Sequence, residues 1–481
     1  MTSRAAQLLR AFKAYDIRGR IGLDLDDDIL FAIGWATAQV MARLHGSSRL
    51  VIGCDMRPDS PRFAAALAAG IEEAGSEATL LGMTSTDQLY FASGHWDAPG
   101  LMVTASHNPA DWNGIKICGP GAAGMSRESG LDEIRELALE APARGSRQAP
   151  AASGAAATEL ATAFAQRIRA LTGLESIARP LRVVADCGNG MAGKLLPEVF
   201  GTAAGLLAAP VEVIGLYTEL DGTFPNHEAN PLDPANLRDV QAAVRAHDAD
   251  LGLAFDGDAD RCFFIDEHGE AISASAIGAL VAVREIKRAR VHEGPRGGAA
   301  GEGVPVVLHN LITSRAVPEA IRAAGGKPVR TPVGHSRIKQ LMREHSAVFA
   351  CEHSAHYYFR DFYGADSGIL AACHVLAALA ETRQPISELS AAWNPYVASG
   401  EINSAVDDPA AALQRVRQAA AEGVFGECTV DELDGVMIEM PEAWCNVRSS
   451  NTEPLVRLNC ETPSQERTDA LVTTALELIR R

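Results

Sequence analysis

Short apolar runs rich in β-branched residues alternate with alanine-rich helical patterns through most of the chain. This alternation is typical of α/β proteins, in which helices connect the strands of a mostly parallel sheet. The chain has 481 residues, and at about 100 to 200 residues per hydrophobic core this length predicts three or four domains. The predicted strands include residues 50–53, 101–104, 182–185, 251–255 and 304–308.

Two segments rich in small residues mark connections between these elements. Residues 142–158 (PARGSRQAPAASGAAAT) show no apolar period, so we expect a first domain to end near residue 155. Residues 294–303 are interpreted as a long loop inside a domain, because a strand-like run follows them directly. The last quarter has its own strands and ends in an amphipathic run over residues 464–479, which predicts a small α+β domain.

Composition excludes several classes of partner. Lys and Arg total 43 against 61 Asp and Glu, a formal net charge of −18, and no basic block is present, so we expect no nucleic acid partner. The nine Cys residues form no C-x-x-C pair and are read as reduced structural thiols. No apolar run approaches the roughly 20 residues that a membrane span needs, and residues 1–20 carry no apolar signal core. These features predict a cytoplasmic protein that does not bind a membrane.

The first polar constellation is Thr104-Ala105-Ser106-His107-Asn108-Pro109, placed directly after a predicted strand. A Ser in a tight turn at a strand end has an exposed hydroxyl, and neighbouring backbone N–H groups can neutralise a phosphate bound to it. Lys116 follows in the segment Asn113-Gly114-Ile115-Lys116. The alternative is an ordinary turn rich in Asn, Pro and Ser, with Lys116 as a solvated charge.

The second constellation is Asp256-Gly257-Asp258-Ala259-Asp260-Arg261, which lies between two apolar runs. Three carboxylates at alternate positions can converge on one divalent cation, and an all-oxygen set favours Mg²⁺ over Zn²⁺. An EF-hand is the competing interpretation, because Glu267 occupies the twelfth position of such a loop. It fails because Arg261 stands where the sixth-position Gly belongs and because the flanks look like strands. A solvated acidic turn stays open as the other alternative.

Two further segments concentrate polar groups. Residues 351–356 (CEHSAH) offer a carboxylate, a hydroxyl and two imidazoles suited to vicinal sugar hydroxyls, with a satisfied core His as the alternative role for either imidazole. Residues 448–454 (RSSNTEP), with Arg457 beyond them, concentrate donors suited to a phosphate dianion, with a capped surface turn as the alternative.

In this order, the four segments resemble those of the α-D-phosphohexomutases. The resemblance begins at Tyr15-Asp16-Ile17-Arg18-Gly19 and continues through all four segments, so it covers nearly the whole chain. The sequences Glu352-His353-Ser354-Ala355-His356 and Gly334-His335-Ser336 are similar to those of the phosphomannomutase branch.

The resemblance implies a fold of four domains around a central cleft, with one functional loop from each domain. Three related α/β domains precede a smaller α+β domain, with boundaries near residues 155, 270 and 385. The implied domains are 1–155 with the phosphoserine loop, 156–270 with the metal-binding loop, 271–385 with the sugar-binding loop, and 386–481 with the phosphate-binding loop.

The resemblance also implies roles for individual residues. Ser106 is the expected phosphoserine, and a phosphoserine oxygen binds Mg²⁺ together with the Asp residues of the second segment. The expected residues are Arg18, Lys116, Arg261 and His335 at the reaction centre, Asp256, Asp258 and Asp260 at the metal, Glu352 and Ser354 at the sugar hydroxyls, and Arg448, Ser450, Asn451 and Thr452 at the phosphate that is not transferred.

One position departs from the pattern of the resemblance. Many relatives carry a phosphate-binding Lys on a strand-to-helix turn of the third domain, where this chain has Leu311. Either His309 or Arg315 compensates, or fewer groups hold the phosphate.

The function implied by the resemblance is the interconversion of mannose 6-phosphate and mannose 1-phosphate through a hexose 1,6-bisphosphate, which also serves as the activator. A phosphoglucomutase or a dual-specificity enzyme is the alternative within the family. A Mg²⁺-dependent phosphatase with Asp256 as nucleophile leaves Ser106 and the Arg448 loop without a role, and a sugar-phosphate binding protein has no need of the Ser106 hydroxyl. Hexose monophosphates are the expected ligands, and the protein is expected to be a monomer or a homodimer.

Overall fold

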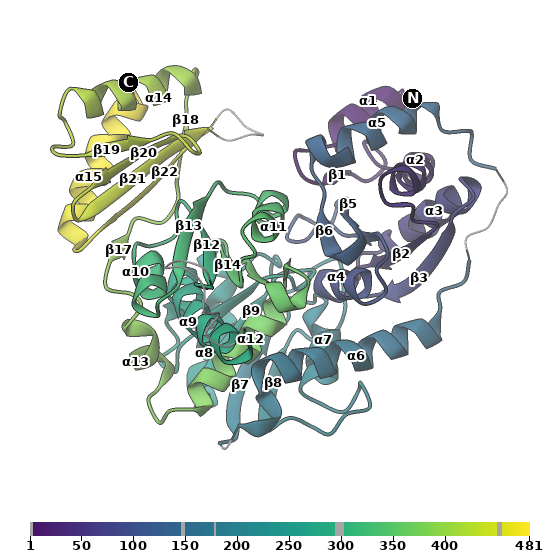
Figure 1. Cartoon of the computed structure of the whole chain (residues 1–481), viewed down its shortest axis with the longest axis horizontal. Helices are drawn as coiled ribbons and strands as arrows, with labels where there is room; N and C mark the ends of the chain where they lie inside the picture. Colours follow the sequence, from purple (N-terminus) through teal and green to yellow (C-terminus); the bar gives the residue numbers. More distant parts are fainter. Residues whose placement is uncertain (1–2, 146–149, 178, 294–302, 450–454) are drawn as a thin grey trace. The chain divides into compact units, whose positions relative to one another are not determined.

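The computed structural model describes residues 3–145, 150–177, 179–293, 303–449 and 455–481. The strands form four sheets, with helices between strands in chain order (Figure 1). The predicted α/β architecture with a distinct C-terminal domain is confirmed. The ends of the strands predicted over residues 50–53, 101–104 and 182–185 differ from those of the observed strands by one residue. The strand predicted over residues 251–255 has the observed bounds, and the one predicted over residues 304–308 begins and ends two residues before the observed Val306–Asn310.

The first sheet combines parallel and antiparallel strands in the order β1-β5-β4-β2-β3, with β6 beside β5. β2 is parallel to β3 and β4, while β5 is antiparallel to β4 and β1. Asp26 caps the start of α2, and Gly46, at φ 66°, ends it. The elements are α1 (Arg4–Ala11), β1 (Ile17–Arg20), α2 (Asp27–His45), β2 (Arg49–Cys54), α3 (Ser60–Glu73), β3 (Glu77–Met83), α4 (Thr86–His95), β4 (Gly100–Val103), β5 (Trp112–Gly119), β6 (Ala123–Gly124) and α5 (Asp132–Glu140).

The second sheet has the order β11-β10-β9-β7-β8. β7 pairs in parallel with β8 and β9, and β10 pairs antiparallel with β9 and β11. The three-Asp loop therefore joins two antiparallel strands, which excludes the helix-flanked EF-hand. The elements are α6 (Gly154–Thr172), β7 (Leu181–Asp186), α7 (Ala192–Val199), β8 (Val211–Leu216), α8 (Arg238–Ala246), β9 (Leu251–Phe255), β10 (Cys262–Ile265) and β11 (Ala271–Ile272).

The third sheet has the order β13-β12-β14-β15-β16, with β12 and β13 parallel. Helices α10 and α11 separate β12, β13 and β14 along the chain, whereas β14, β15 and β16 follow one another without an intervening α-helix. The elements are α9 (Ala274–Glu293), β12 (Val306–Asn310), α10 (Ala316–Ala323), β13 (Lys327–Thr331), α11 (His335–Glu344), β14 (Phe349–Cys351), β15 (Tyr357–Phe359), β16 (Ala365–Asp366), α12 (Gly368–Ala380) and α13 (Ile386–Ala391).

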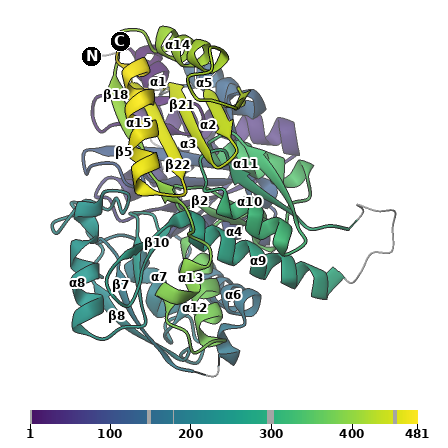
Figure 2. The same cartoon turned by 90° about the vertical axis from the view of Figure 1, so that its left-hand side faces the viewer.

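The fourth sheet is antiparallel in the order β17-β22-β21-β20-β19, with β18 beside β22. Helices α14 and α15 pack together and against this sheet (Figure 2). The predicted amphipathic run is α15, which Ser464 caps. The elements are β17 (Val397–Ala398), β18 (Ile402–Ala405), α14 (Pro409–Ala421), β19 (Thr429–Asp431), β20 (Val436–Met440), β21 (Ala443–Ser449), β22 (Leu455–Thr462) and α15 (Gln465–Ile479).

The chain divides into two compact units. The first unit comprises Met1–Ala274, Gly334–Ala350 and Ser354–Leu389, and the second comprises Ser275–Val333, Cys351–His353 and Ser390–Arg481. The domain boundaries expected near residues 155, 270 and 385 stay predictions. Within the described residues, no helix combines the length and the apolar content needed to cross a membrane.

Candidate active site

Ser106 lies in the first unit, on the loop that leaves the carboxyl end of β4. Its backbone has φ 50°, in the left-handed region that residues other than Gly rarely adopt. The Ser106 N–H donates to Thr104 Oγ1 at 2.9 Å, and its Oγ donates to Asp256 Oδ2 at 2.7 Å. The side chain is buried, contrary to the exposed hydroxyl that the turn predicted. Although 150 residues separate them in sequence, the two predicted loops meet through this hydroxyl.

Gly257 permits the close approach of these two loops. A Cβ atom added to Gly257 would lie 2.5 Å from the carbonyl oxygen of Ser106, well inside van der Waals contact. The residue between the first two Asp of the loop must therefore be Gly for steric reasons. Sequence analysis did not single out this glycine.

The three Asp side chains of the loop converge as predicted. Asp256, Asp258 and Asp260 are buried, and one carboxylate oxygen of each lies within 4.8 Å of the others. Asp258 Oδ1 and Asp260 Oδ1 have no hydrogen-bond partner among the described residues. A buried carboxylate oxygen without a partner is costly, and a hard divalent cation would satisfy both. The donor set therefore fits Mg²⁺.

Two cations offset part of the negative charge of this loop. Lys116 Nζ lies 2.7 Å from Asp258 Oδ2 and also binds Asp260. Arg261 donates to Asp256 Oδ2 from Nε at 2.9 Å and lies 2.8 Å from it through Nη2. Lys116, Arg261 and the three Asp thus form one buried cluster.

The environment pushes the pKa values of these groups apart. Burial raises the pKa of Asp256 to about 7, although Arg261 opposes the shift. Burial also acts to raise the pKa of Asp258, but the charge of Lys116 and its hydrogen bond outweigh burial and hold that pKa well below its usual value. Burial acts to lower the pKa of Lys116, yet the charges of Asp258 and Asp260 raise it overall, so Lys116 remains an ammonium.

Arg18 and His107 complete the surroundings of Ser106. Arg18, in β1, donates to Asn108 Oδ1 at 2.6 Å and is oriented by Asp16 at 2.7 Å. His107 Nδ1 accepts from Arg261 Nη2 at 2.6 Å and lies 3.2 Å from Ser106 Oγ. Burial, followed by the charge of Arg261, lowers the pKa of His107 well below its usual value. His107 is therefore neutral beside the hydroxyl.

Sequence analysis missed Thr86, the first residue of α4. Thr86 Oγ1 donates to Asp258 Oδ2 at 2.6 Å, and its N–H donates to the Asp258 carbonyl at 3.1 Å. These two bonds and Lys116 hold one side of Asp258, so that Oδ1 is left for a metal. Ser85 caps the start of α4, and nothing in the sequence beside Thr86 points to the Asp loop.

Ser354 also belongs to the first unit. Its hydroxyl lies 2.9 Å from His356 Nδ1, and His356 Nε2 lies 4.0 Å from Asp260 Oδ1. His356, Asp260 and Asp366 form a second group of metal-ligating type. Lys339 Nζ lies 2.8 Å from Asp366 in this group. The three-Asp group is the better Mg²⁺ candidate, because all of its ligands are oxygen atoms. His335 begins α11, and its side chain lies outside the described residues.

The remaining predicted residues belong to the second unit. Glu352 is buried and accepts from Asn310 Nδ2 at 3.3 Å. Arg448 and Arg457 face each other across β21 and β22 and share Glu401, at 2.5 Å and 3.3 Å respectively. Two facing guanidinium groups form a natural anion site. Ser450, Asn451 and Thr452 lie outside the described residues.

Leu311 itself cannot take the role of the missing Lys, and the two candidates beside it differ in charge. Leu311 is buried and packs with Met437 and Trp444. His309 is buried, and burial lowers its pKa to about 4, so it carries no positive charge near neutral pH. Arg315 Nη1 donates to the Met440 carbonyl at 3.4 Å.

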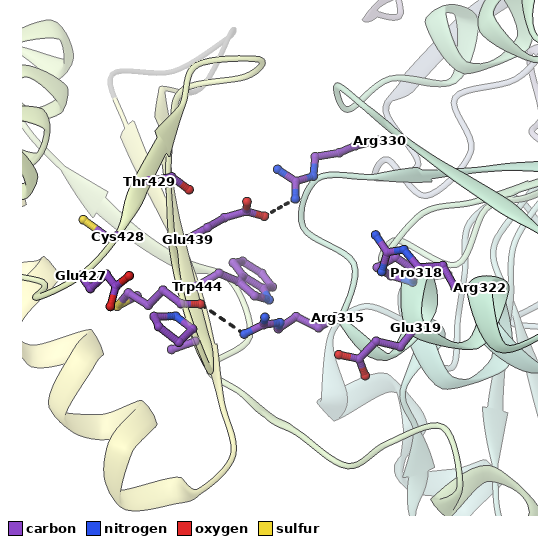
Figure 3. A pocket seen from close by; sticks show the side chains of 13 residues that line it. Arg315, Pro318, Glu319, Arg322, Arg330, Glu427, Cys428, Thr429, Glu439 and Trp444 are labelled. Atoms are coloured by element: carbon purple, nitrogen blue, oxygen red, sulfur yellow. Dashed lines mark hydrogen bonds and ion pairs between the residues drawn. The ribbon is translucent and has the colours of Figure 1, made fainter.

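Arg315 lines a cavity of about 510 Å³ within the second unit (Figure 3). Helix α10, its N-cap Arg315 and Arg330 form one wall, and residues 427–429, 439–441, 443 and 444 form the other. Three Arg and three Glu line the cavity, and Arg330 binds Glu439 and, at 3.2 Å, Asp431. The three positive and three negative side chains balance, and Arg330 is already paired. The cavity therefore offers no net charge that would attract a phosphate. Of the residues that sequence analysis singled out, only Arg315, an alternative phosphate-binding candidate, lines the cavity.

Comparison with known proteins covers all four parts of the chain. Residues 9–144, 162–269 and 277–396 match the profiles of phosphoglucomutase/phosphomannomutase alpha/beta/alpha domains I, II and III. Residues 401–478 match the phosphoglucomutase/phosphomannomutase C-terminal domain.

Individual relatives agree with these profiles. A phosphomannomutase of Salmonella typhimurium is 38% identical over 462 residues, which cover 94% of this chain and 95% of that protein. A protein of Xanthomonas campestris named phosphohexose mutases is 37% identical over 461 residues, with the same coverage. A crystal structure of a phosphoglucomutase/phosphomannomutase family protein from Burkholderia thailandensis superposes with a TM-score of 0.82 at 30% identity, covering 100% of this chain and 98% of that one. The chain therefore belongs to the phosphoglucomutase/phosphomannomutase family of phosphohexomutases.

Proposed function

We propose that this phosphohexomutase interconverts mannose 6-phosphate and mannose 1-phosphate through a phosphorylated Ser106. The observation that carries the proposal is the 2.7 Å contact between Ser106 Oγ and Asp256. It brings the nucleophile into the buried group of three carboxylates. A hydroxyl there is close to a metal site and to two cations, Lys116 and Arg261, which is the arrangement that phosphoryl transfer needs.

The proposed cycle conserves the phosphoryl group. Phospho-Ser106 gives its phosphoryl group to a hydroxyl of the hexose monophosphate, and Ser106 Oγ recovers a proton as the sugar hydroxyl loses one. The resulting hexose 1,6-bisphosphate turns end for end. Ser106 then accepts the other phosphoryl group, which leaves the isomeric monophosphate and restores the phosphoenzyme.

The residues of the first unit supply electrostatic stabilisation in this cycle. The transition state of phosphoryl transfer is largely dissociative, so positioning and charge neutralisation dominate catalysis. Arg261 and Lys116 are held as cations and would face the charge on the transferring group. Mg²⁺, when held by the three Asp and the phosphoserine, would neutralise charge on the phosphoryl oxygens.

Groups of the second unit suit the distal end of the substrate. Arg448 and Arg457 present facing guanidinium groups for the phosphate that is not transferred. Glu352, with Ser354 of the first unit, is proposed to bind sugar hydroxyls. A hexose 1,6-bisphosphate is proposed as the activator, because it can phosphorylate Ser106 and leave a monophosphate product.

The proposed preference for mannose phosphates rests on the sequence of residues 352–356 and on relatives named phosphomannomutase at 34 to 38% identity. Phosphoglucomutase or dual-specificity activity is the alternative. A phosphatase with Asp256 as nucleophile is disfavoured, because Asp256 Oδ2 is already occupied. It accepts from Ser106 Oγ and contacts both Nε and Nη2 of Arg261.

The test compares wild type, Ser106→Ala and, as a matched control, Ser176→Ala at an exposed serine. Coupled assays with mannose 1-phosphate and glucose 1-phosphate measure turnover, and intact mass spectrometry measures bound phosphate. We expect Ser106→Ala to lose both the activity and the phosphate while remaining folded, and the control to keep both. EDTA should abolish wild-type activity and Mg²⁺ restore it. Wild-type turnover in Ser106→Ala would refute the proposal.

A further inference from the structure

One buried arginine binds the backbone of the loop that carries Ser106. Arg57 follows β2, and its side chain is completely buried. Its Nη1 and Nη2 atoms each donate two hydrogen bonds, at distances from 2.6 to 3.0 Å. The four acceptors are the carbonyl oxygens of Ser106, Asn108, Pro109 and Trp112. Sequence analysis gave Arg57 no role.

Other buried groups hold Arg57 in place. Asp55 Oδ2 lies 3.2 Å from Arg57 Nε, and both side chains are fully buried. The guanidinium also lies over the ring of Phe224, 5.1 Å from its centroid. Ser60 Oγ donates to Asp55 at 2.5 Å and accepts from Asn113 Nδ2 at 2.9 Å. Burying such a pair costs more free energy than its mutual attraction returns unless further hydrogen bonds satisfy it, and the four carbonyls do so.

These four bonds determine which way the loop's peptide groups face. In a planar trans peptide the C=O and the following N–H point in opposite directions. The Ser106 carbonyl faces Arg57, so the His107 N–H faces away from it. No described residue accepts a hydrogen bond from this N–H. It is therefore available to an anion on the side of the loop opposite Arg57.

The backbone of Ser106 needs such support. At φ 50° the residue stands in a conformation that costs an L-residue about 1 to 2 kcal/mol. Strained backbone persists when surrounding contacts over-determine it. The bond from Arg57 to the Ser106 carbonyl and the bond from the Ser106 N–H to Thr104 constrain both sides of this residue.

We propose that Arg57 is the positioning residue of the phosphoserine loop. By binding four carbonyl groups it keeps Ser106 Oγ directed at Asp256 and presents the His107 N–H to an oxygen of the phosphoryl group. Arg57 acts through the loop and does not contact the substrate. The inference rests on the proposed role of Ser106, while its structural part, the ordering of the loop, does not depend on turnover.

The test compares Arg57→Lys with Arg62→Lys, a control on neighbouring α3. The Arg62 side chain is 47% exposed and pairs with Asp27 and Asp59. A Lys at residue 57 keeps the charge but cannot reach four acceptors with a planar fork. We expect kcat to fall about 10- to 100-fold, as for a misplacement of about 1 Å, with KM within about twofold of wild type. Hydrogen exchange of the peptide covering residues 104–113 should accelerate, and the control should match wild type in all three measurements.

The outcomes separate this inference from the proposed function. Wild-type kcat and loop exchange in folded Arg57→Lys would overturn it. If Arg57→Lys does not fold, Asp55→Asn replaces it, since this change keeps Arg57 and removes its ionic partner. A loss of kcat smaller than that expected for Arg57→Lys, together with faster hydrogen exchange of the loop, supports the inference. Wild-type kcat and wild-type exchange in Asp55→Asn refute it. If Ser106→Ala stays active, the proposed function fails, yet loop exchange still decides whether Arg57 orders the loop.

Discussion

The substitution Gly257→Ala tests how closely the serine and metal loops must approach. The added methyl group would lie 2.5 Å from the Ser106 carbonyl oxygen. Relief to an ordinary contact needs a displacement of about 0.9 Å between the two loops. Arg57 donates to that same carbonyl at 2.9 Å, so a movement of the serine loop away from Gly257 would strain this hydrogen bond.

The expected effect is large on catalysis and moderate on stability. Overpacking of this size costs about 1 to 3 kcal/mol of unfolding free energy. A displacement of nearly 1 Å between Ser106 and Asp256 should lower kcat about 10- to 100-fold, and the upper value corresponds to about 2.7 kcal/mol of lost transition-state stabilisation. The two effects are measured separately, by a coupled mutase assay and by urea unfolding.

Gly154→Ala is the matched control. No atom lies within 4 Å of a Cβ built at Gly154, which begins α6. This variant should keep wild-type kcat and gain a little stability, since Ala is the better helix residue by about 0.5 to 1 kcal/mol. A Gly257→Ala enzyme with wild-type kcat would refute the claim that steric contact sets the spacing of the two loops.

Three further predictions concern the metal site, the distal phosphate site and the pH dependence of stability. Asp258→Asn removes an anionic ligand and should weaken Mg²⁺ binding on the order of tenfold or more in calorimetric titration; unchanged affinity would place the metal elsewhere. Arg448→Ala should raise KM about tenfold with little change in kcat, whereas Arg467→Ala, at an exposed ion pair, should change neither; an unchanged KM in Arg448→Ala would make that residue structural. Burial raises the pKa of Asp87 to about 7. Near pH 6 the folded protein therefore keeps a proton on Asp87 that the unfolded chain has released. The free energy of unfolding falls as the pH rises through 7 and this proton is lost. Wild type should lose about 1.4 kcal/mol from this group between pH 6 and 8, and Asp87→Asn should lack this loss in urea unfolding; equal pH dependence of both proteins would contradict the assignment.

Local patterns in the sequence were sufficient for the elements that carry the site. The apolar run at residues 251–255 and the cluster of carboxylates after it predicted β9 and a loop of converging Asp side chains, because both depend on neighbours in sequence. The C-terminal run at residues 464–479 likewise predicted α15 from its apolar period. Residue types at short spacing determine such features.

The contacts that join distant segments were not predictable in the same way. Thr86 and Arg57 act on loops that follow them by 172 and by 49 to 55 residues. Nothing near either residue indicates which backbone it will meet after folding. The pairing of Arg448 and Arg457 with Glu401 depends in the same way on strand register. The departure at Leu311 was visible, but the packing of this side chain against Trp444 was not.

Glu401 makes the two facing arginines an already occupied anion site. A phosphate that arrives there displaces a carboxylate of the chain itself, so its net binding free energy is the difference between two sets of charge-assisted bonds. The exchange lowers the affinity for any single anion and shortens its residence time, because tighter contacts mainly slow dissociation. In the proposed cycle the bisphosphate must release both ends before it turns, and an internal competitor at the distal phosphate makes that release easier.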